Sequence, residues 1–340
     1  MQVVSITGER RCELIERSEP TVAGAFAKVK VLAAPMCTEV ANYCRGDRTD
    51  CLGHEAAGVV VDAGPKCKIA AGTRVIAMPL NGCGACELCM AGDHILCPHG
   101  VDVHAACGSA TGMATYAQYL LKADHLLLPI PDDIDVDHAS MACCGLGPTF
   151  GAMLRMNVRA GDTVLISGLG AVGLGGVIAA TFYGARVIGL EPNEWRGELA
   201  KRLGCARVID PRDADAAIHQ IMELTGGVGV DKAIECSSQE GAPALLVRAT
   251  RRNGQITSVG WGGPVNARDL VGKGLTFHGQ WHWNHQLHAR EMFNLIRGTS
   301  AKLDQFITHR LPMTRVKEAW ELQAAGKCGK IVLHPWEGNN

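Results

Sequence analysis

The chain has 340 residues, more than one hydrophobic core usually holds, so about two domains are expected. Hydrophobic residues make up 47% of it and charged residues 20%, a balance that excludes a disordered chain and a coiled coil. The 33 basic and 34 acidic side chains nearly balance, and no basic stripe is present that could bind a phosphate backbone, so no nucleic-acid partner is expected.

The first part of the chain predicts a unit built mainly of strands. Short runs rich in valine, isoleucine and leucine alternate there with glycine and proline, at residues 27–33, 58–61, 74–78 and 116–121. Short strands at such spacing are typical of barrels and related β structures.

Four cysteines crowd into a glycine-rich lobe at residues 82–98. They are Cys83, Cys86, Cys89 and Cys97, with two residues between each of the first three and seven before the last. Four thiolates at this density fit a tetrahedral zinc site better than two disulfides or scattered core cysteines, because nothing else in the chain is typical of a secreted protein. Such a site has no open coordination position, so we expect this zinc to be structural.

From about residue 163 the pattern changes to strands that alternate with helices. Strands are predicted at residues 163–167, 185–190, 231–236 and 255–259, and helices at residues 171–183, 195–203 and 242–251. This alternation predicts right-handed βαβ crossovers and a parallel sheet. A helix at residues 288–297 and a strand at residues 330–334 are expected to follow.

A glycine-rich turn follows the first of these strands. Its sequence is Gly168-Leu169-Gly170-Ala171-Val172-Gly173. The glycines permit a tight turn and close approach of a pyrophosphate, and the helix N-terminus offers the positive end of its dipole. Glu191 closes the next strand, where a carboxylate accepts hydrogen bonds from the adenosine ribose and repels a 2′-phosphate. The segment therefore predicts a dinucleotide site that favours NAD, although Arg196 offers a cation for the 2′-phosphate of NADP.

The reacting centre must lie outside the four-cysteine lobe. His54 lies in the stretch Gly53-His54-Glu55-Ala56-Ala57-Gly58, directly before a predicted strand. With Cys37 and Cys144, it offers two thiolates and one imidazole, a set that leaves a fourth position on zinc open for a substrate. We therefore expect a catalytic zinc at these three residues and two zinc ions per chain.

Together, these motifs resemble those of the zinc-dependent alcohol dehydrogenases of the medium-chain dehydrogenase/reductase superfamily, which bind catalytic zinc with the same ligand types. The resemblance covers essentially the full length and also includes Cys144-Gly145, residues 231–236 and Val259-Gly260. It implies an α/β fold with a GroES-like, β-rich catalytic domain and a Rossmann domain with a doubly wound parallel sheet. The implied ranges are 1–150 for the GroES-like domain, 151–280 for the Rossmann domain and 281–340 for a C-terminal return to the catalytic domain.

The resemblance also implies roles for individual residues. Thr38 looks like the hydroxyl that takes the alcohol proton. Glu39 and Glu55 look like carboxylates that orient the metal ligands, unless they are ordinary cap or surface acids, and Glu55 could coordinate zinc transiently. Val259, Gly260 and Trp261 match positions near the nicotinamide.

The chain departs from the family pattern around Cys37. Family members usually carry Cys, one spacer, Ser or Thr, and then Asp, with a His shortly after, whereas this chain reads Cys37-Thr38-Glu39 and has no such His. Proton release is then expected to pass through water, Asn42, Tyr43 or the cofactor ribose. The third ligand also has an adjacent alternative, Cys143, but Cys144 is the residue that matches the family.

The expected function is hydride transfer between an alcohol, or its carbonyl product, and NAD. A polyol, amino-alcohol or cyclitol dehydrogenase is the alternative within the superfamily, and a non-catalytic protein that binds zinc and nucleotide is the alternative outside it. Trp261 and Trp281 would either line the substrate pocket or pack in a subunit interface. We expect a cytoplasmic protein without a membrane partner, because no signal peptide or long apolar run is present. We also expect a homodimer or homotetramer.

Overall fold

The structure is a computed structural model that describes residues 1–338, and its chain divides into two compact units. Unit 1 comprises Met1–Gly145, Asn284–Arg297 and Ile307–Asn340. Unit 2 comprises Leu146–Trp283 and Gly298–Phe306.

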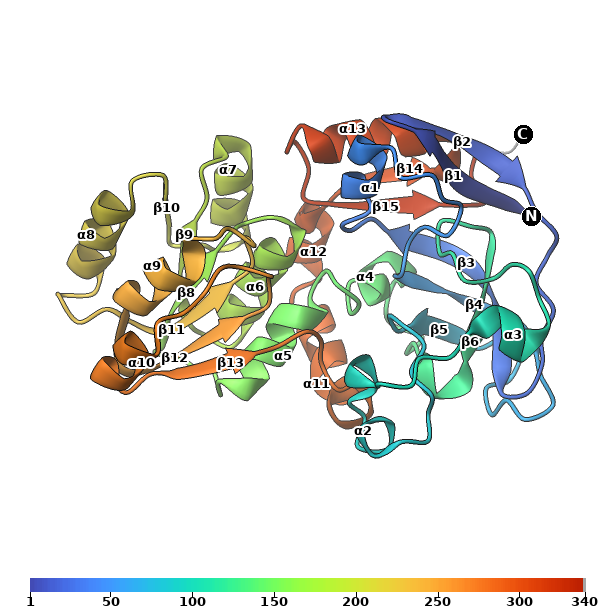
Figure 1. Ribbon diagram of the computed structural model, residues 1–340, viewed down its shortest axis with the longest axis horizontal. Coiled ribbons are helices and arrows are strands. Elements are labelled where there is room, and N and C mark those ends of the chain that lie inside the picture. The colour runs from blue at the N-terminus through green and yellow to red at the C-terminus, as the bar shows by residue number, and fades with distance from the viewer. Residues whose placement is uncertain (339–340) are drawn as a thin grey trace. The chain divides into compact units, whose positions relative to one another are not determined.

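Unit 1 is rich in β structure, as the sequence predicts (Figure 1). Its strands are β1 (Gln2–Gly8), β2 (Arg11–Glu16), β3 (Phe26–Pro35), β4 (Ala56–Ala63), β5 (Arg74–Ala77), β6 (Tyr119–Ala123), β7 (Leu127–Pro129), β14 (Ile307–Pro312) and β15 (Lys330–His334). Seven of them form one sheet in which β14, β15, β3, β4, β5 and β7 are successive neighbours and β6 pairs with β3. Strand β3 is central because it lies between β15 and β4 and also pairs with β6. Its side chains Val29 and Val31 are fully buried in the core.

Unit 1 also contains helices, most of which are short. They are α1 (Val40–Arg45), α2 (Glu87–Met90), η1 (His94–Leu96), α3 (Val103–Cys107), η2 (Asp124–Leu126), α4 (Val136–Ser140), α11 (His285–Gly298), η3 (Met313–Arg315) and α13 (Val316–Ala324). Strand β6 begins at Tyr119 and not at residue 116, because the backbone of Tyr116 bonds to Leu52 and Val4 instead. These backbone bonds hold the side chain of Tyr116 beside the candidate metal centre.

Unit 2 has a six-stranded parallel sheet in the order β10, β9, β8, β11, β12, β13. The strands are β8 (Thr163–Ser167), β9 (Arg186–Leu190), β10 (Arg207–Ile209), β11 (Val230–Glu235), β12 (Thr250–Ser258) and β13 (Thr276–Gly279). The order reverses direction between β8 and β11. In open parallel sheets, ligands bind at the carboxyl ends of the strands beside such a reversal.

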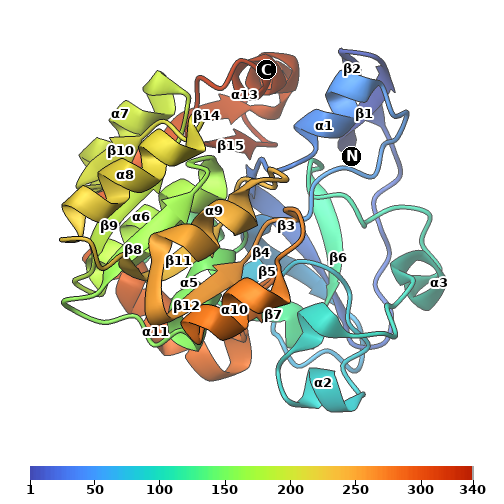
Figure 2. The same cartoon turned by 60° about the vertical axis from the view of Figure 1, so that its left-hand side comes forward.

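Helices cover both faces of this sheet (Figure 2). They are α5 (Gly147–Arg155), α6 (Ala171–Phe182), α7 (Glu194–Leu203), α8 (Ala214–Leu224), α9 (Ala242–Ala249), α10 (Ala267–Lys273) and α12 (Ser300–Phe306). Helix α6 packs on β8 and β9, whereas α9 packs on β8, β11 and β12. The predicted doubly wound α/β arrangement is confirmed.

One segment lies in a different unit from the expected one. Residues Gly298–Phe306 belong to unit 2, although the sequence places everything after residue 280 in the catalytic domain. Helix α12 packs there against α6 and α7, where Leu303 and Phe306 are fully buried and Lys302 Nζ donates to Thr181 Oγ1 at 2.7 Å. These apolar contacts are long-range, so the local sequence pattern does not reveal them.

Candidate metal centres and nucleotide site

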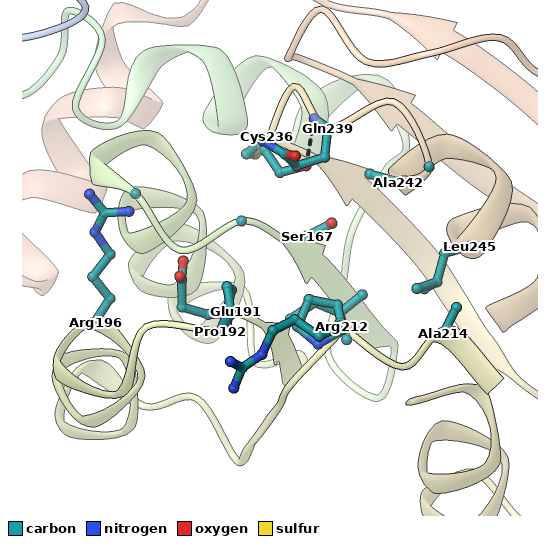
Figure 3. A pocket seen from close by; sticks show the side chains of 16 residues that line it. Ser167, Glu191, Pro192, Arg196, Arg212, Ala214, Cys236, Gln239, Ala242 and Leu245 are labelled. Atoms are coloured by element: carbon teal, nitrogen blue, oxygen red, sulfur yellow. Dashed lines mark hydrogen bonds between the residues drawn. The ribbon is translucent and has the colours of Figure 1, made fainter. Parts of the chain in front are cut away.

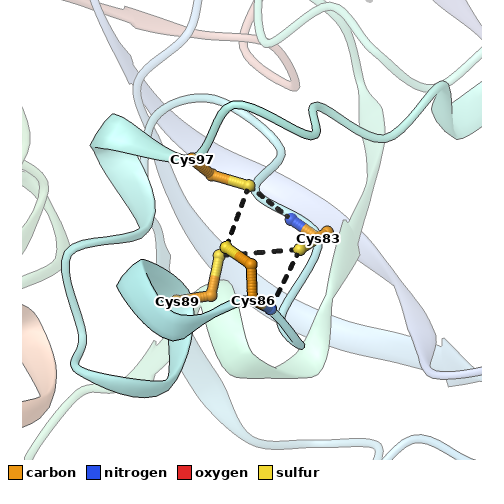
Figure 4. A group of neighbouring side chains, drawn as sticks. All are labelled: Cys83, Cys86, Cys89 and Cys97. Carbon is orange, nitrogen blue, oxygen red and sulfur yellow. Dashed lines mark hydrogen bonds between the residues drawn. The ribbon is translucent and has the colours of Figure 1, made fainter.

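The four cysteines of the lobe converge on one point (Figure 4). Their four Sγ atoms lie within 4.8 Å of one another. The Cys86–Cys97 and Cys83–Cys89 sulfur distances are 3.7 and 4.0 Å. Sulfurs on a tetrahedral zinc lie about 3.8 Å apart, whereas a disulfide needs about 2 Å. The set therefore fits a bound zinc and no disulfide.

Backbone amides prepare these thiols for a metal. The N–H groups of Ala85 and Cys86 donate to Cys83 Sγ at 3.5 and 3.3 Å. These bonds lower the pKa of Cys83 to about 6. The N–H groups of Cys83 and His99 donate to Cys97 Sγ, each at 3.3 Å. Because zinc binds the thiolate form, the loop backbone favours metal binding.

The second cluster joins Cys37, His54, Glu55 and Cys144, whose candidate ligand atoms also lie within 4.8 Å of one another. His54 Nε2 lies 3.3 Å from Cys144 Sγ. Cys143 points elsewhere, since its thiol donates to the carbonyl of Ala77 at 3.5 Å. The structure thus brings together the three predicted ligands, including Cys37 despite its missing spacer.

Two strand ends and the end of a helix position the three ligands. Cys37 follows the end of β3, His54 precedes β4, and Cys144 follows α4. Gly53 is required before His54 for two reasons. Its φ of +83° disfavours any residue with a side chain, and a Cβ there would lie 2.6 Å from the Tyr116 ring. The turn that positions His54 therefore packs directly against the ring of Tyr116, with no room for a side chain at residue 53.

Carboxylates fix the orientation of these ligands. Glu39 Oε1 lies 2.7 Å from His54 Nδ1, which leaves Nε2 to face the metal. Glu39 precedes α1 without making a capping bond and is 8% exposed, so it is neither a cap nor a surface acid. Glu55 is fully buried, and its Oε2 accepts the backbone N–H of Cys144 at 3.1 Å.

The structure adds two residues to this centre that the sequence did not predict there, Lys330 and Tyr116. Lys330 Nζ lies 2.8 Å from Glu55 Oε1, and both side chains are fully buried. The phenol of Tyr116 donates to Glu39 Oε2 at 2.9 Å.

The surroundings of Cys37 lower the pKa of its thiol. The hydrogen bond from Cys144 has the largest effect, and together with the nearby cations Lys330 and His54 it outweighs burial, which would raise this pKa. The centre thus favours a thiolate before any metal binds.

Thr38 and Tyr43 have different surroundings. Thr38, beside Cys37, is exposed. Tyr43 is fully buried, and its hydroxyl bonds to the carbonyl of Arg10 at 3.0 Å and to Glu321 at 2.8 Å. Because the Tyr43 hydroxyl is engaged by Arg10 and Glu321, its expected part in proton release is not supported.

Unit 2 contains a cavity of about 610 Å³ at the carboxyl ends of β8, β9 and β11 (Figure 3). Gly168 and Gly170 line it, next to Ser167. A Cβ on Gly168 would lie 2.7 Å from Ser237, and a Cβ on Gly173 would lie 1.9 Å from the Gly168 carbonyl oxygen. The space beside Gly170 is open. The turn thus needs glycine at positions 168 and 173, and the open space beside Gly170 leaves room for a pyrophosphate.

Charged side chains flank the cavity where an adenosine ribose would lie. Glu191 Oε2 accepts the N–H of Leu169 at 2.8 Å, and its Oε1 accepts the N–H of Asn193 at 3.0 Å. The carboxylate is thereby fixed and retains lone pairs for ribose hydroxyls. Arg196 and Arg212 line the same cavity, and Arg212 is paired with Asp210.

The expected nicotinamide residues lie apart from the lining of this cavity. Val259 and Gly260 follow β12, and their N–H groups donate to the Glu235 carbonyl at 2.9 and 3.0 Å. Trp261 is 81% exposed and packs edge-on against Trp281, with ring centroids 6.0 Å apart. Neither tryptophan lines the cavity, and Ala171 and Val172 begin α6 behind the glycine turn.

Two family models match the chain. The alcohol dehydrogenase GroES-like domain matches residues 25–132, and the zinc-binding dehydrogenase model matches residues 171–297. An uncharacterized zinc-type alcohol dehydrogenase-like protein of Escherichia coli is 30% identical over 295 residues, which cover 83% of this chain and 80% of that protein. The L-threonine 3-dehydrogenase of Bacillus velezensis is 30% identical over 341 residues, with 93% of each chain covered.

Solved structures share the fold. The alcohol dehydrogenase of Thermus sp. ATN1 superposes with a TM-score of 0.87 at 22% identity, covering 98% of this chain and 99% of that one. The 2R,3R-butanediol dehydrogenase of Bacillus subtilis gives a TM-score of 0.82 at 20% identity, with the same coverage. Among residues 1–338, no helix combines the length and the apolar character that crossing a bilayer requires.

Proposed function

We propose that this chain, which belongs to the zinc-dependent alcohol dehydrogenase family, interconverts an alcohol and its carbonyl product with NAD as the hydride carrier. The observation that carries the proposal is the convergence of Cys37, His54 and Cys144 on one point. Both oxygens of the neighbouring Glu55 already accept bonds, from Lys330 and from the N–H of Cys144. Three ligands therefore remain for zinc, and a fourth position is left for substrate.

Zinc bound at these residues would act as a Lewis acid toward the substrate oxygen, and NAD would carry the hydride. The chain itself supplies the orientation and the proton path. Glu39 holds the His54 tautomer that presents Nε2. Thr38, exposed beside Cys37, is the proposed acceptor of the alcohol proton. The proton then passes to water, Asn42 or the cofactor ribose, because the hydroxyl of Tyr43 is engaged elsewhere.

Metal analysis of His54→Ala tests the reacting centre. We expect two zinc ions per wild-type chain and one in His54→Ala, which should lose turnover but bind NAD normally, since the glycine turn lies in unit 2. Thr38→Val is the matched contrast. It should retain both zinc ions and lose roughly 10²- to 10⁴-fold in rate, as expected for removal of a proton-transfer group. A wild-type chain with one zinc, held by the four-cysteine lobe, would instead indicate the non-catalytic alternative.

The cofactor preference can be tested at Glu191. We expect Glu191→Ala to weaken NAD binding by about 1 kcal/mol or more, because a ribose acceptor is lost. The same change should narrow the gap between the affinities for NAD and NADP, since Arg196 would then face the 2′-phosphate without the opposing carboxylate of Glu191. Isothermal titration with each dinucleotide measures both effects. A wild-type chain that already prefers NADP would refute this assignment.

The names of similar proteins indicate which substrates to test first. Two similar proteins are named for L-threonine and for 2R,3R-butanediol, which both carry a secondary alcohol beside a second polar group. An absorbance assay for NADH should therefore begin with amino alcohols and vicinal diols, then cyclitols and simple alcohols. We also propose a homodimer or homotetramer, which sedimentation would test.

A further inference from the structure

Tyr116 contacts one of the three residues that would hold the catalytic zinc, Cys37, and the carboxylate of Glu39, which orients a second one, His54. Its phenol donates to Glu39 Oε2 at 2.9 Å and accepts the backbone N–H of Cys37 at 3.4 Å. Glu39 Oε1 in turn lies 2.7 Å from His54 Nδ1. One hydroxyl therefore connects the backbone of one ligand with the carboxylate that orients another.

Burial makes these hydrogen bonds consequential. Tyr116 is fully buried and Glu39 is 8% exposed, so water cannot readily replace a lost partner. Glu39 Oε2 also accepts the N–H of Cys37 at 3.2 Å, which gives the carboxylate three donors in all. Removing the phenol hydroxyl would leave Glu39 Oε2 with only the longer bond from the N–H of Cys37, so the carboxylate could turn more easily about its side chain. A turned carboxylate would release His54 Nδ1 from its fixed direction.

Backbone and packing contacts place the phenol. The N–H of Tyr116 donates to the Leu52 carbonyl at 3.1 Å, and its carbonyl accepts the N–H of Val4 at 2.9 Å. The ring lies against Gly53, where even a methyl group would collide with it. Trp320 packs on another side, with ring centroids 6.3 Å apart. The tyrosine is thus held rigidly against the turn that carries His54.

We propose that Tyr116 is a positioning residue for the catalytic metal, which it helps to hold through Glu39 and through the backbone of Cys37. This inference rests on the proposed metal centre at Cys37, His54 and Cys144. It assigns the phenol a role in metal affinity and ligand geometry, and no role in proton transfer to substrate. Removing an outer partner of a metal ligand typically costs about 10- to 100-fold in metal affinity.

Tyr116→Phe removes only the hydroxyl, and Tyr43→Phe is the matched control. Tyr43 is also a fully buried tyrosine in the same core, but its hydroxyl bonds to Arg10 and Glu321. Zinc content is measured by competition with a chelator, and His54→Ala gives the content expected with the catalytic site empty. We expect Tyr116→Phe to bind zinc at this site about 10-fold more weakly or worse. Tyr43→Phe should stay within twofold of wild type.

Two further measurements keep a structural effect apart from the proposed one. Replacing zinc by Co²⁺ should give an altered visible spectrum in Tyr116→Phe and an unaltered one in Tyr43→Phe, because the spectrum reports ligand geometry. In a Glu39→Gln background, the effect of Tyr116→Phe on affinity should shrink, since the two act in series. Equal zinc affinity and spectra in both tyrosine variants would overturn the inference. A wild-type chain with no more zinc than His54→Ala would instead overturn the metal centre itself.

Discussion

A buried ammonium group beside two thiols is an unusual element of the metal centre. Lys330 Nζ lies 2.8 Å from Glu55 Oε1, and neither side chain is exposed. Burial alone would lower the pKa of Lys330, but Glu55 and the thiols of Cys37 and Cys144 raise it instead. The lysine therefore stays charged and offsets part of the negative charge of Glu55 and of the Cys37 thiolate.

Lys330→Met should be strongly destabilising for this reason. It would leave the Glu55 carboxylate buried without a cation, which typically costs about 3 to 5 kcal/mol of unfolding free energy. The double variant Lys330→Met with Glu55→Gln should recover most of that loss, because no unpaired charge remains. Denaturant unfolding of the three chains measures both effects. A single variant as stable as wild type would contradict the ion pair.

At the scale of elements, we expect the four-cysteine lobe to need a bound metal for a defined structure. Its α2 has 4 residues and its η1 has 3, lengths at which isolated helices are unstable in water. Contacts from outside give some support. His125 Nε2 lies 3.1 Å from the Gly82 carbonyl oxygen, and the rings of His94 and His285 pack edge-on at 4.5 Å.

Cys83→Ser should accordingly remove the structural zinc and lower the thermal midpoint. A loss of about 2 kcal/mol or more is expected, and this corresponds to a fall of roughly 4 °C or more. The other zinc should remain, because its ligands lie on different segments. Calorimetry and metal analysis of the variant give the answer. Unchanged zinc content and midpoint would show that these sulfurs hold no metal.

Elements with a strong local pattern could be predicted from the sequence. Strands β8 and β15 begin and end at the predicted residues, and the glycine turn lies where its spacing placed it. Contacts between segments that are distant in the sequence could not be predicted in this way. Glu55 and Lys330 are 275 residues apart in the sequence, and Glu39 and Tyr116 are 77 apart. The local sequence predicts Tyr116 only as a residue of a strand. Its role follows from the buried residues that it contacts, such as Glu39.

At the scale of the molecule, one cluster joins separate parts of unit 1. Asp137 in α4 bonds to Arg310 in β14 at 2.7 Å and to His334 in β15 at 3.0 Å. The bond to Asp137 and the nearby Glu337 raise the pKa of His334. Burial alone would raise the pKa of Asp137, but the bonds from His334 and Arg310 lower it. The cluster therefore makes unit 1 more stable in one range of pH.

The two pKa shifts define that range. A raised pKa for His334 in the folded state means that its contribution is complete below about pH 6.5 and is lost as the pH rises through the folded value. A lowered pKa for Asp137 means that its contribution is complete above about pH 4 and is lost as the pH falls through its folded value. Both contributions are present between about pH 4 and pH 6.5.

His334→Gln should therefore destabilise the protein by about 1 kcal/mol at pH 5.5 and by less at pH 8.5, because the contribution of the charged histidine declines once the pH rises above its unfolded pKa. Asp137→Asn should be destabilising at both values, since Arg310 loses its carboxylate as well. The measurement is the difference in unfolding free energy between wild type and each variant, in which the pH dependence of the metal sites largely cancels. Equal losses for His334→Gln at both values would show that the imidazole is uncharged in the folded protein, and that its bond to Asp137 is an ordinary neutral one.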